Sequence, residues 1–377
     1  MDQRNAPKLN PSKQYARIDV ARFFCALLVV AIHVRPLETY TELGNFLLDK
    51  GLCRIAVPFF FLVSGFFWAR KPMTAKSLGS FLGRIVILYG LWTAIYYPVV
   101  LKSQDMTNYW RRCVLSGSYY HLWYYPAMIV AVILTWFGFR LLAPRAALTK
   151  PLNNRGGVVV LIALVFYAIG CMGESYYGFF ADNETVTTLA ETYFDLFWST
   201  RSGLFFGFFF FALGAYLQKA RWTMSRRKAA VALGVSLGLM AVEILTLRSF
   251  EVAKDYNLYF ALIPATLFLF LWLTGRPDRG SNGGSEGSGV ISSKLCSFCR
   301  KSSVLIYGIH LWFKYYGLQW TQETVADVGS GWTGLADLLI NNSLVQYIVI
   351  CVLSLAFATV IIGLQKVPFL KFLKYLY

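Results

Sequence analysis

Two ionisable side chains share one face of the first apolar segment in this sequence. Arg22 and His33 are separated by the ten-residue run FFCALLVVAI. On a helix, eleven steps of about 100° return to within about 20° of the starting face, roughly 16.5 Å along the axis. Ionisable residues inside apolar spans are costly, so each is a candidate for catalysis or ligand binding. A polar group at each end of an apolar stripe suits a ligand that threads between them. The alternative is that Arg22 reaches lipid headgroups and His33 bonds to a neighbouring carbonyl.

The second apolar segment begins and ends with basic residues that could bind anions. Arg54 precedes the run IAVPFFFLVSGFFWA, which ends at Arg70 and Lys71. Arg54 could hold an anionic group or a developing oxyanion, or pair with an acid outside the membrane. Arg70, Lys71 and the later Arg84 belong to a basic cluster that suits phosphates. The excess of basic residues in cytoplasmic loops predicts such a cluster as well.

Three further polar residues lie in or beside apolar segments. His121 precedes the run LWYYP, and His310 lies in the middle of a late apolar segment. A histidine at that depth lines a cavity or bonds to another helix. Glu243 is the only acid well inside an apolar segment, where it could relay protons or pair with a buried cation.

The elements that must position these groups are membrane helices. The chain is 57% hydrophobic, 17% aromatic and 15% charged, whereas a soluble domain carries about 25% charged residues. This composition excludes an ordinary soluble fold, disorder, a disulfide scaffold and a collagen-like fibre. Cys296 and Cys299 form a lone CxxC without a second pair, so we expect no metal. Runs of roughly 18–20 apolar residues predict about ten membrane helices. They lie at 18–35, 52–69, 79–101, 122–142, 156–174, 203–218, 228–247, 257–275, 303–320 and 344–366.

The basic residues predict how these helices are oriented. Of the 36 Lys and Arg, 25 fall on the side of the termini and the even-numbered loops, and eight fall on the other side. Because cytoplasmic loops are rich in Lys and Arg, we expect an all-α polytopic membrane protein with both termini in the cytoplasm. It would be a single domain over 1–377, with a flexible cytoplasmic linker at 277–290. The net charge of +17 then reflects orientation and anionic lipid, and we expect no nucleic-acid partner.

Several landmarks together resemble a known family. They are the Arg22 and His33 pair, the run from Val57 to Ser64-Gly65, the tripeptide His121-Leu-Trp123, and Tyr307-Gly-Ile-His310. In this order and spacing, along all ten predicted spans, the chain resembles the integral-membrane acyltransferase family 3. The stretches IHVRPL and RIAVPFFF also resemble the membrane domain of membrane-bound serine racemases. That subgroup carries a soluble pyridoxal-phosphate domain after its last span.

The resemblance implies a function and assigns roles. It implies transfer of an acyl group, usually acetyl, from cytoplasmic acyl-CoA to a hydroxyl of a glycan, a cell-envelope precursor, a lipid or a small molecule. The enzyme would lie in the bacterial plasma membrane, with its acceptor at the outer face and no metal. Arg22 and His33 would be catalytic, and Arg84 would contact CoA.

From these roles we derive a mechanism. We expect the CoA phosphates near Arg84, Lys71 and Arg22, with Arg70 beside them, and His33 as general base on the acceptor hydroxyl. Arg54 or a Trp or Tyr donor would stabilise the oxyanion, and a route through an acyl-His33 intermediate is the alternative. The remaining polar residues would contact substrate or protons: His121, His310, Tyr307 and Glu243. A homodimer is one assembly such a chain could form.

A transporter is the competing class. The likeness to racemase membrane domains leaves open that the chain takes up an amino acid and transfers no acyl group. Many transporters show internal repeats and paired broken helices, and the sequence shows no convincing repeat between its halves.

Overall fold

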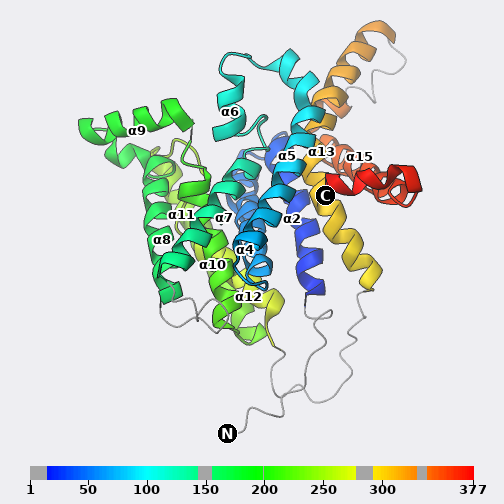
Figure 1. Ribbon diagram of the computed structural model, residues 1–377. Helices are drawn as coiled ribbons and strands as arrows, with labels where there is room; N and C mark the ends of the chain where they lie inside the picture. The colour runs from blue at the N-terminus through cyan, green and yellow to red at the C-terminus, as the bar shows by residue number, and fades with distance from the viewer. Residues whose placement is uncertain (1–14, 143–154, 198, 277–291, 329–337) are drawn as a thin grey trace.

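The computed structural model describes residues 15–142, 155–197, 199–276, 292–328 and 338–377, and these residues are almost entirely helical (Figure 1). Within these ranges the only β-type pairing is an isolated bridge between Ser225 and Arg276. The all-α prediction is confirmed, while the predicted linker 277–290 lies outside the described residues. The elements are α2 (Ala16–Val34), α3 (Glu42–Phe46), η2 (Leu47–Gly51), η3 (Leu52–Ile55), α4 (Ala56–Trp68), α5 (Ala75–Ser103), α6 (Tyr109–Leu115), α7 (Tyr124–Leu142), α8 (Arg155–Gly173), η5 (Tyr177–Phe180), α9 (Glu184–Phe197), η6 (Gly203–Gly207), α10 (Phe208–Ala220), α11 (Arg226–Ser249), α12 (Leu262–Thr274), α13 (Ser293–Val328), α15 (Ser343–Leu364) and η7 (Pro368–Leu376).

Seven helical segments in the described residues are long and apolar enough to cross a membrane. They are Glu42–Trp68, Ala75–Ser103, Tyr124–Leu142, Gly156–Gly173, Gly203–Ala220, Arg226–Ser249 and Ser343–Leu364. The other three predicted spans coincide with helices of a different character. α12 has only 13 residues, α2 carries Arg17, Asp19 and Arg22, and α13 begins with a basic first half and contains Lys314. The protein is therefore a helical membrane protein, and the count of ten spans and their orientation stay predictions.

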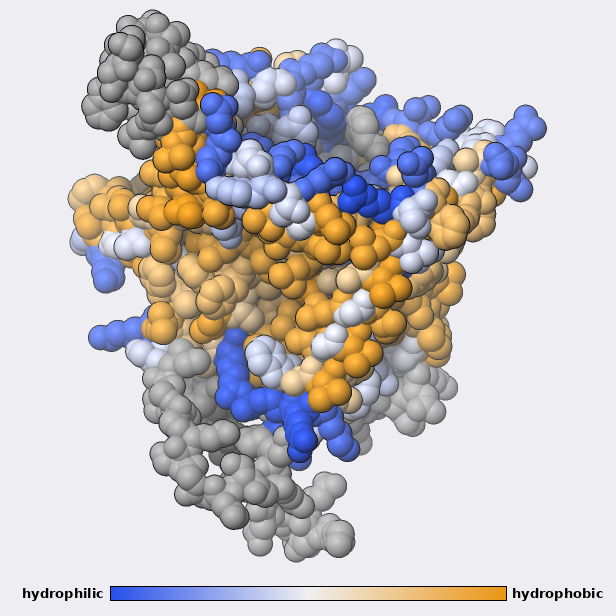
Figure 2. Space-filling view, turned by 180° about the vertical axis from the view of Figure 1, so that it is seen from behind, coloured by the Kyte–Doolittle hydropathy of each residue, from blue (hydrophilic) through white to orange (hydrophobic). Residues whose placement is uncertain are grey.

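Burial separates the central helices from those that face lipid. In the most apolar stretch of Glu42–Trp68, 78% of residues are buried, against 17% in Ala75–Ser103 and in Ser343–Leu364. Figure 2 shows the resulting surface: an apolar band crosses the middle of the molecule, with hydrophilic residues above and below it.

The central pair of helices, α4 and α10, packs backbone against backbone. A Cβ at Gly65 would lie 2.0 Å from the backbone oxygen of Phe211, and a Cβ at Gly214 would lie 1.9 Å from that of Leu62. Only glycine permits such an approach, which is typical of helix pairs in membranes.

Helices α2 and α13 lie side by side and parallel, although almost the whole chain separates them (Figure 1). At one end Arg300 Nη1 donates to Asp19 Oδ2 at 3.0 Å, and at the other Lys314 Nζ donates to the His33 carbonyl at 2.5 Å. Both contacts join residues 281 apart in sequence, so the two helices run in register. This register brings the polar residues of the first helix next to those of α13.

Candidate functional site

The three histidines of the chain form one cluster. His33 ends α2, His121 precedes α7, and His310 lies in α13. The ring centroid of His310 is 5.2 Å from that of His33 and 5.0 Å from that of His121, and the rings of His33 and His121 are 6.4 Å apart. Histidines predicted on separate helices are thus brought together by the packing of α2 against α13.

Backbone carbonyls determine which nitrogen carries the proton in two of these rings. His310 Nδ1 lies 2.9 Å from the Tyr307 carbonyl oxygen, and His121 Nε2 lies 3.1 Å from that of Gly308. A carbonyl only accepts, so in the neutral rings these nitrogens carry the N–H. The other nitrogens, His310 Nε2 and His121 Nδ1, are then acceptors, and both are buried without a partner in the described structure. Unpaired buried acceptors are costly, so the cluster is suited to receive an N–H or O–H donor.

No three His, Cys, Asp or Glu side chains within the described ranges are placed to hold a metal ion.

A small cavity of about 40 Å³ adjoins the cluster and is hereafter called the small cavity. His33, His121 and Tyr307 form part of its wall, and the cations that line it are Arg54 and Arg201. No Asp or Glu lines it. The formally charged groups in its wall are therefore both basic.

Asn257 lies between these two cations and the acids Asp255 and Glu174. Its Oδ1 accepts from Arg54 at 2.5 Å and from Arg201 at 3.2 Å, while its Nδ2 donates to Asp255 at 2.6 Å and to Glu174 at 3.1 Å. The amide oxygen thus accepts two hydrogen bonds and the amide nitrogen donates two, which is all that the group can form. The asparagine thus turns its acceptor toward the cavity and its donors away from it.

Arg54 is buried and is held in place by several hydrogen bonds. Only 9% of the residue is exposed. Besides Asn257, it donates to the Asp49 carbonyl at 3.1 Å and to Asp49 Oδ1 at 3.4 Å. Lys50 lies 3.4 Å from Asp255 in the same network. Arg54 therefore pairs with an acid, and it also lines the small cavity; its role in holding an anion stays a prediction.

The loop acid Asp255 is kept ionised by this network. Burial alone would raise the pKa of its carboxyl. The charges of Arg54 and Lys50 and the backbone N–H of Tyr256 outweigh burial and hold the pKa of Asp255 at about 2.

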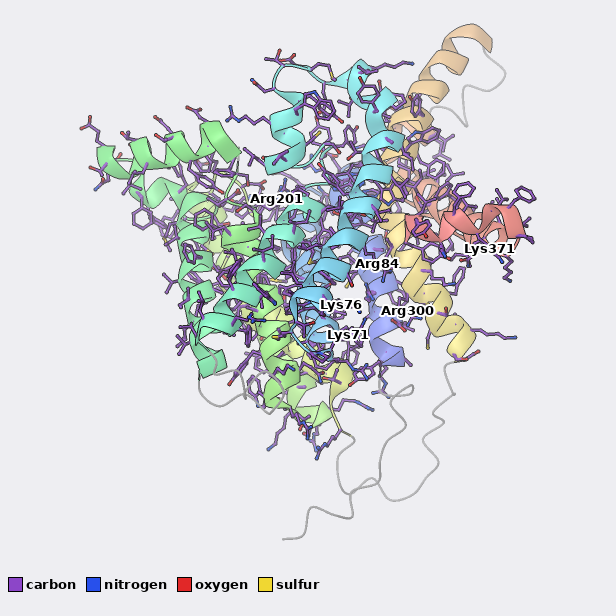
Figure 3. All side chains as sticks on the ribbon, in the orientation of Figure 1. Lys71, Lys76, Arg84, Arg201, Arg300 and Lys371 are labelled. Atoms are coloured by element: carbon purple, nitrogen blue, oxygen red, sulfur yellow. The ribbon has the colours of Figure 1, made fainter. Side chains whose placement is uncertain are left out.

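A large cavity of about 840 Å³, hereafter the large cavity, has five basic residues in its lining. These are Arg22 of α2, Arg84 of α5, Arg300 and Lys301 of α13, and Lys374 of η7, and no Asp or Glu lines the cavity. Figure 3 shows Arg84 and Arg300 on neighbouring helices. The Nε atom of Arg22 is buried without a hydrogen-bond partner in the described structure. Such a lining suits a ligand that carries several phosphates and a long uncharged arm.

The two cavities share one lining residue. Tyr307 lines both of them, and its hydroxyl donates to the carbonyl oxygen of His121. A ligand in the large cavity and a ligand in the small cavity would therefore approach each other at Tyr307, beside the histidine cluster.

Three residues predicted for the site lie elsewhere. Arg70 and Lys71 do not line the large cavity, and the Arg70 guanidinium lies over the ring of Tyr15, 4.9 Å from its centroid. Glu243 accepts from the Tyr176 hydroxyl at 2.5 Å and from the backbone N–H groups of Phe260 and Ala261 at 2.7 and 2.6 Å. It fixes the start of α12 through neutral donors, and its role as a proton relay stays a prediction.

Sequence reasoning missed the cations that complete both cavities. Arg201 was one of eight basic residues on the outer side, and Arg300, Lys301 and Lys374 were counted only as evidence of orientation. The one local signal for Arg201 is its place directly before the apolar segment that starts at Gly203. The tertiary contacts that bring it to His33 leave no pattern in the sequence.

Comparison with known proteins defines the family. The acyltransferase domain of family 3 matches residues 15–363, and the chain belongs to this family. It is 31% identical over 364 residues to an amino-acid racemase of Enterococcus faecalis, which covers 94% of this chain and 46% of the relative. It is 30% identical over 276 residues to a serine/alanine racemase of Enterococcus gallinarum, covering 70% of this chain and 38% of the relative. The chain thus spans less than half the length of each of these relatives. No solved structure matches it.

Proposed function

We propose that this protein transfers an acyl group, acetyl in the simplest case, from cytoplasmic acyl-CoA to a hydroxyl at the outer face of the bacterial plasma membrane. The observation that supports this function is that Tyr307 lines both cavities. One is lined by cations suited to the phosphates of CoA, and the other contains His33. Membership of the acyltransferase family supports the reaction class.

In the proposed reaction the acceptor hydroxyl lies in the small cavity and the thioester reaches Tyr307 through the large cavity. His33 takes the hydroxyl proton as the oxygen attacks the thioester carbon. The new C–O bond forms, the C–S bond breaks, and the proton passes from His33 to the departing thiolate. The unpaired acceptors on His310 and His121 would stabilise the transient positive charge on the His33 ring.

Arg54 would stabilise the negative charge on the tetrahedral oxygen. It lines the small cavity, and Asp49 and Asn257 hold its guanidinium in place. Preorganised donors of this kind contribute strongly in water-excluded sites.

Replacing His33 by Ala tests the proposal. We expect loss of acetyl transfer from radiolabelled acetyl-CoA in membranes. The protein should still fold in detergent, because the substitution keeps the His33 carbonyl that accepts from Lys314. A His33→Ala protein that keeps the wild-type turnover would exclude His33 as the base.

A second function, uptake of an amino acid, is favoured by the names of the relatives, which are amino-acid and serine/alanine racemases. The two functions differ in their need for acyl-CoA. Labelled serine that enters proteoliposomes without acyl-CoA, together with no acetylated product in membranes, would favour uptake.

A further inference from the structure

The charge of the small cavity limits what can bind in it. Two guanidinium groups, those of Arg54 and Arg201, line it together with His33, and no carboxylate does. Three acids lie behind this lining: Asp49 pairs with Arg54, and Asp255 and Glu174 accept from Asn257. In the wall itself a negatively charged ligand would meet cations and no carboxylate.

Arg201 is the cation in this lining that has N–H donors left for a ligand. Its guanidinium lies over the ring of Trp123, 4.9 Å from the centroid, and Nη1 donates to Asn257. Arg54 has an acid within 3.4 Å, namely Asp49, whereas no carboxylate within the described ranges lies within 4.0 Å of the Arg201 guanidinium. An arginine has five N–H donors in a planar fork that matches a carboxylate. Trp123 and Asn257 fix the plane of this fork at the cavity wall.

The size of the cavity restricts the ligand further. A volume of about 40 Å³ has room for about three water molecules. A carboxylate with an adjacent hydroxyl-bearing carbon fits such a space, and a sugar ring does not. Larger acceptors could enter only with a terminal group.

We propose that the acceptor is a small hydroxy acid, with its carboxylate bound by Arg201 and its hydroxyl placed at His33. Naming the ligand an acceptor rests on the proposed acyl transfer, but its binding is measurable without turnover. Arg201 is then the residue that selects the acceptor, while Arg54 remains available for the oxyanion. An amino acid would add an ammonium group, for which the lining offers no carboxylate.

Binding of radiolabelled lactate and glycerate to the purified full chain in detergent tests this proposal. We expect unlabelled lactate and glycerate to compete, and lactamide and glyceramide, which keep the hydroxyl but lack the charge, to compete at least tenfold more weakly. Equal competition by acids and amides would overturn the proposal.

Substitutions test whether Arg201 is the residue that binds the carboxylate. Arg201→Gln should weaken lactate binding at least tenfold, and Arg201→Lys should weaken it less because one charge remains without the planar fork. Arg248→Gln is the matched control, since Arg248 pairs with Glu42 at the end of α11 and does not line the small cavity. Unchanged binding in both Arg201 variants, with intact folding shown by thermal unfolding, would overturn the proposal. If Arg201→Gln does not fold, the comparison of Arg201→Lys with wild type decides.

A second measurement separates this inference from the proposed function. Acetylated lactate should form when acetyl-CoA is added to wild-type membranes, with a raised KM for lactate and a similar kcat in Arg201→Lys. Lactate binding that depends on Arg201 without any acetylated product would support the anion site and contradict acyl transfer. Acetylation of neutral hydroxyl compounds that is unaffected by Arg201 variants would support acyl transfer and contradict the anion site.

Discussion

Arg84 is the residue on which the sequence-based CoA prediction and the large cavity agree. It lines the cavity together with Arg300. Replacing it by Gln should raise the KM for acetyl-CoA severalfold, about 1 kcal/mol, and change kcat little, because an exposed contact to phosphate acts in binding and not in the chemical step. Initial rates against acetyl-CoA concentration measure the effect.

The control lies on the same helix. Lys76 is an exposed basic residue of α5 that does not line the cavity, so Lys76→Gln should leave the KM unchanged. Acetyl-pantetheine lacks the nucleotide phosphates and should be used equally by Arg84→Gln and wild type. An equal loss with both donors would show that Arg84 acts on something other than phosphate.

Asp255 gives a prediction of pH dependence at the same scale. Its folded pKa of about 2 lies below the usual 3.8, so its ionised form stabilises the folded state at neutral pH, and this contribution is lost as the pH falls from about 4 toward 2. Because 39% of the side chain is exposed, we expect only about 1 kcal/mol. Thermal unfolding in detergent should show Asp255→Asn less stable than wild type by a constant amount from pH 8 to pH 5, with the difference shrinking below about pH 4. A difference that grows on acidification would contradict the ion pairing.

At the scale of elements, the contact of α4 with α10 is the most specific packing feature. Gly214→Ala places a methyl group 1.9 Å from the Leu62 backbone oxygen, so the two helices must separate. We expect a strongly lowered melting temperature or loss of the folded protein, since displaced helices leave voids in a close-packed core. Gly234 of α11 is the control, because nothing lies within 4 Å of a Cβ built there. Gly234→Ala should be neutral or stabilise by up to about 1 kcal/mol through helix propensity.

The lengths of the apolar segments predicted most of these helices, because the thickness of the bilayer sets the length of a helix that crosses it. The predicted span at 228–247 corresponds to Arg226–Ser249, and the span at 344–366 corresponds to Ser343–Leu364. The prediction is weakest where backbone groups are satisfied by tertiary contacts. The span at 257–275 is helical only from Leu262 to Thr274, because Glu243 accepts from the N–H groups just before it. The connection between α8 and α10 contains α9, whose start is fixed by Asn183 Oδ1 accepting from the backbone N–H of Val186.

At the scale of the whole molecule, the sequence predicted which polar residues matter better than it predicted their neighbours. His33 and His310 were singled out because charge and polarity are rare in apolar segments. Their contact depends on the parallel register of α2 and α13, which are distant in sequence. Arg201 was indistinguishable from other outer basic residues for the same reason. The residues of a site can thus be found because burying a polar side chain costs free energy. The geometry of the site can be found only when the packing of the helices is known.

The proposed reaction fixes which side of the membrane each cavity must face. Acyl-CoA is cytoplasmic, so the large cavity with Arg84 and Arg300 must open to the cytoplasm, and Arg201 must lie toward the outer face; Figure 3 shows Arg201 away from Lys71 and Lys76. The exposed residues Lys71 and Glu184 lie on opposite predicted sides. A membrane-impermeant maleimide should label Glu184→Cys in intact cells and Lys71→Cys only after permeabilisation. Background labelling should be low because six of the seven native cysteines are buried. The reverse pattern would place the large cavity outside, away from acyl-CoA, and would contradict both the predicted topology and the proposed function.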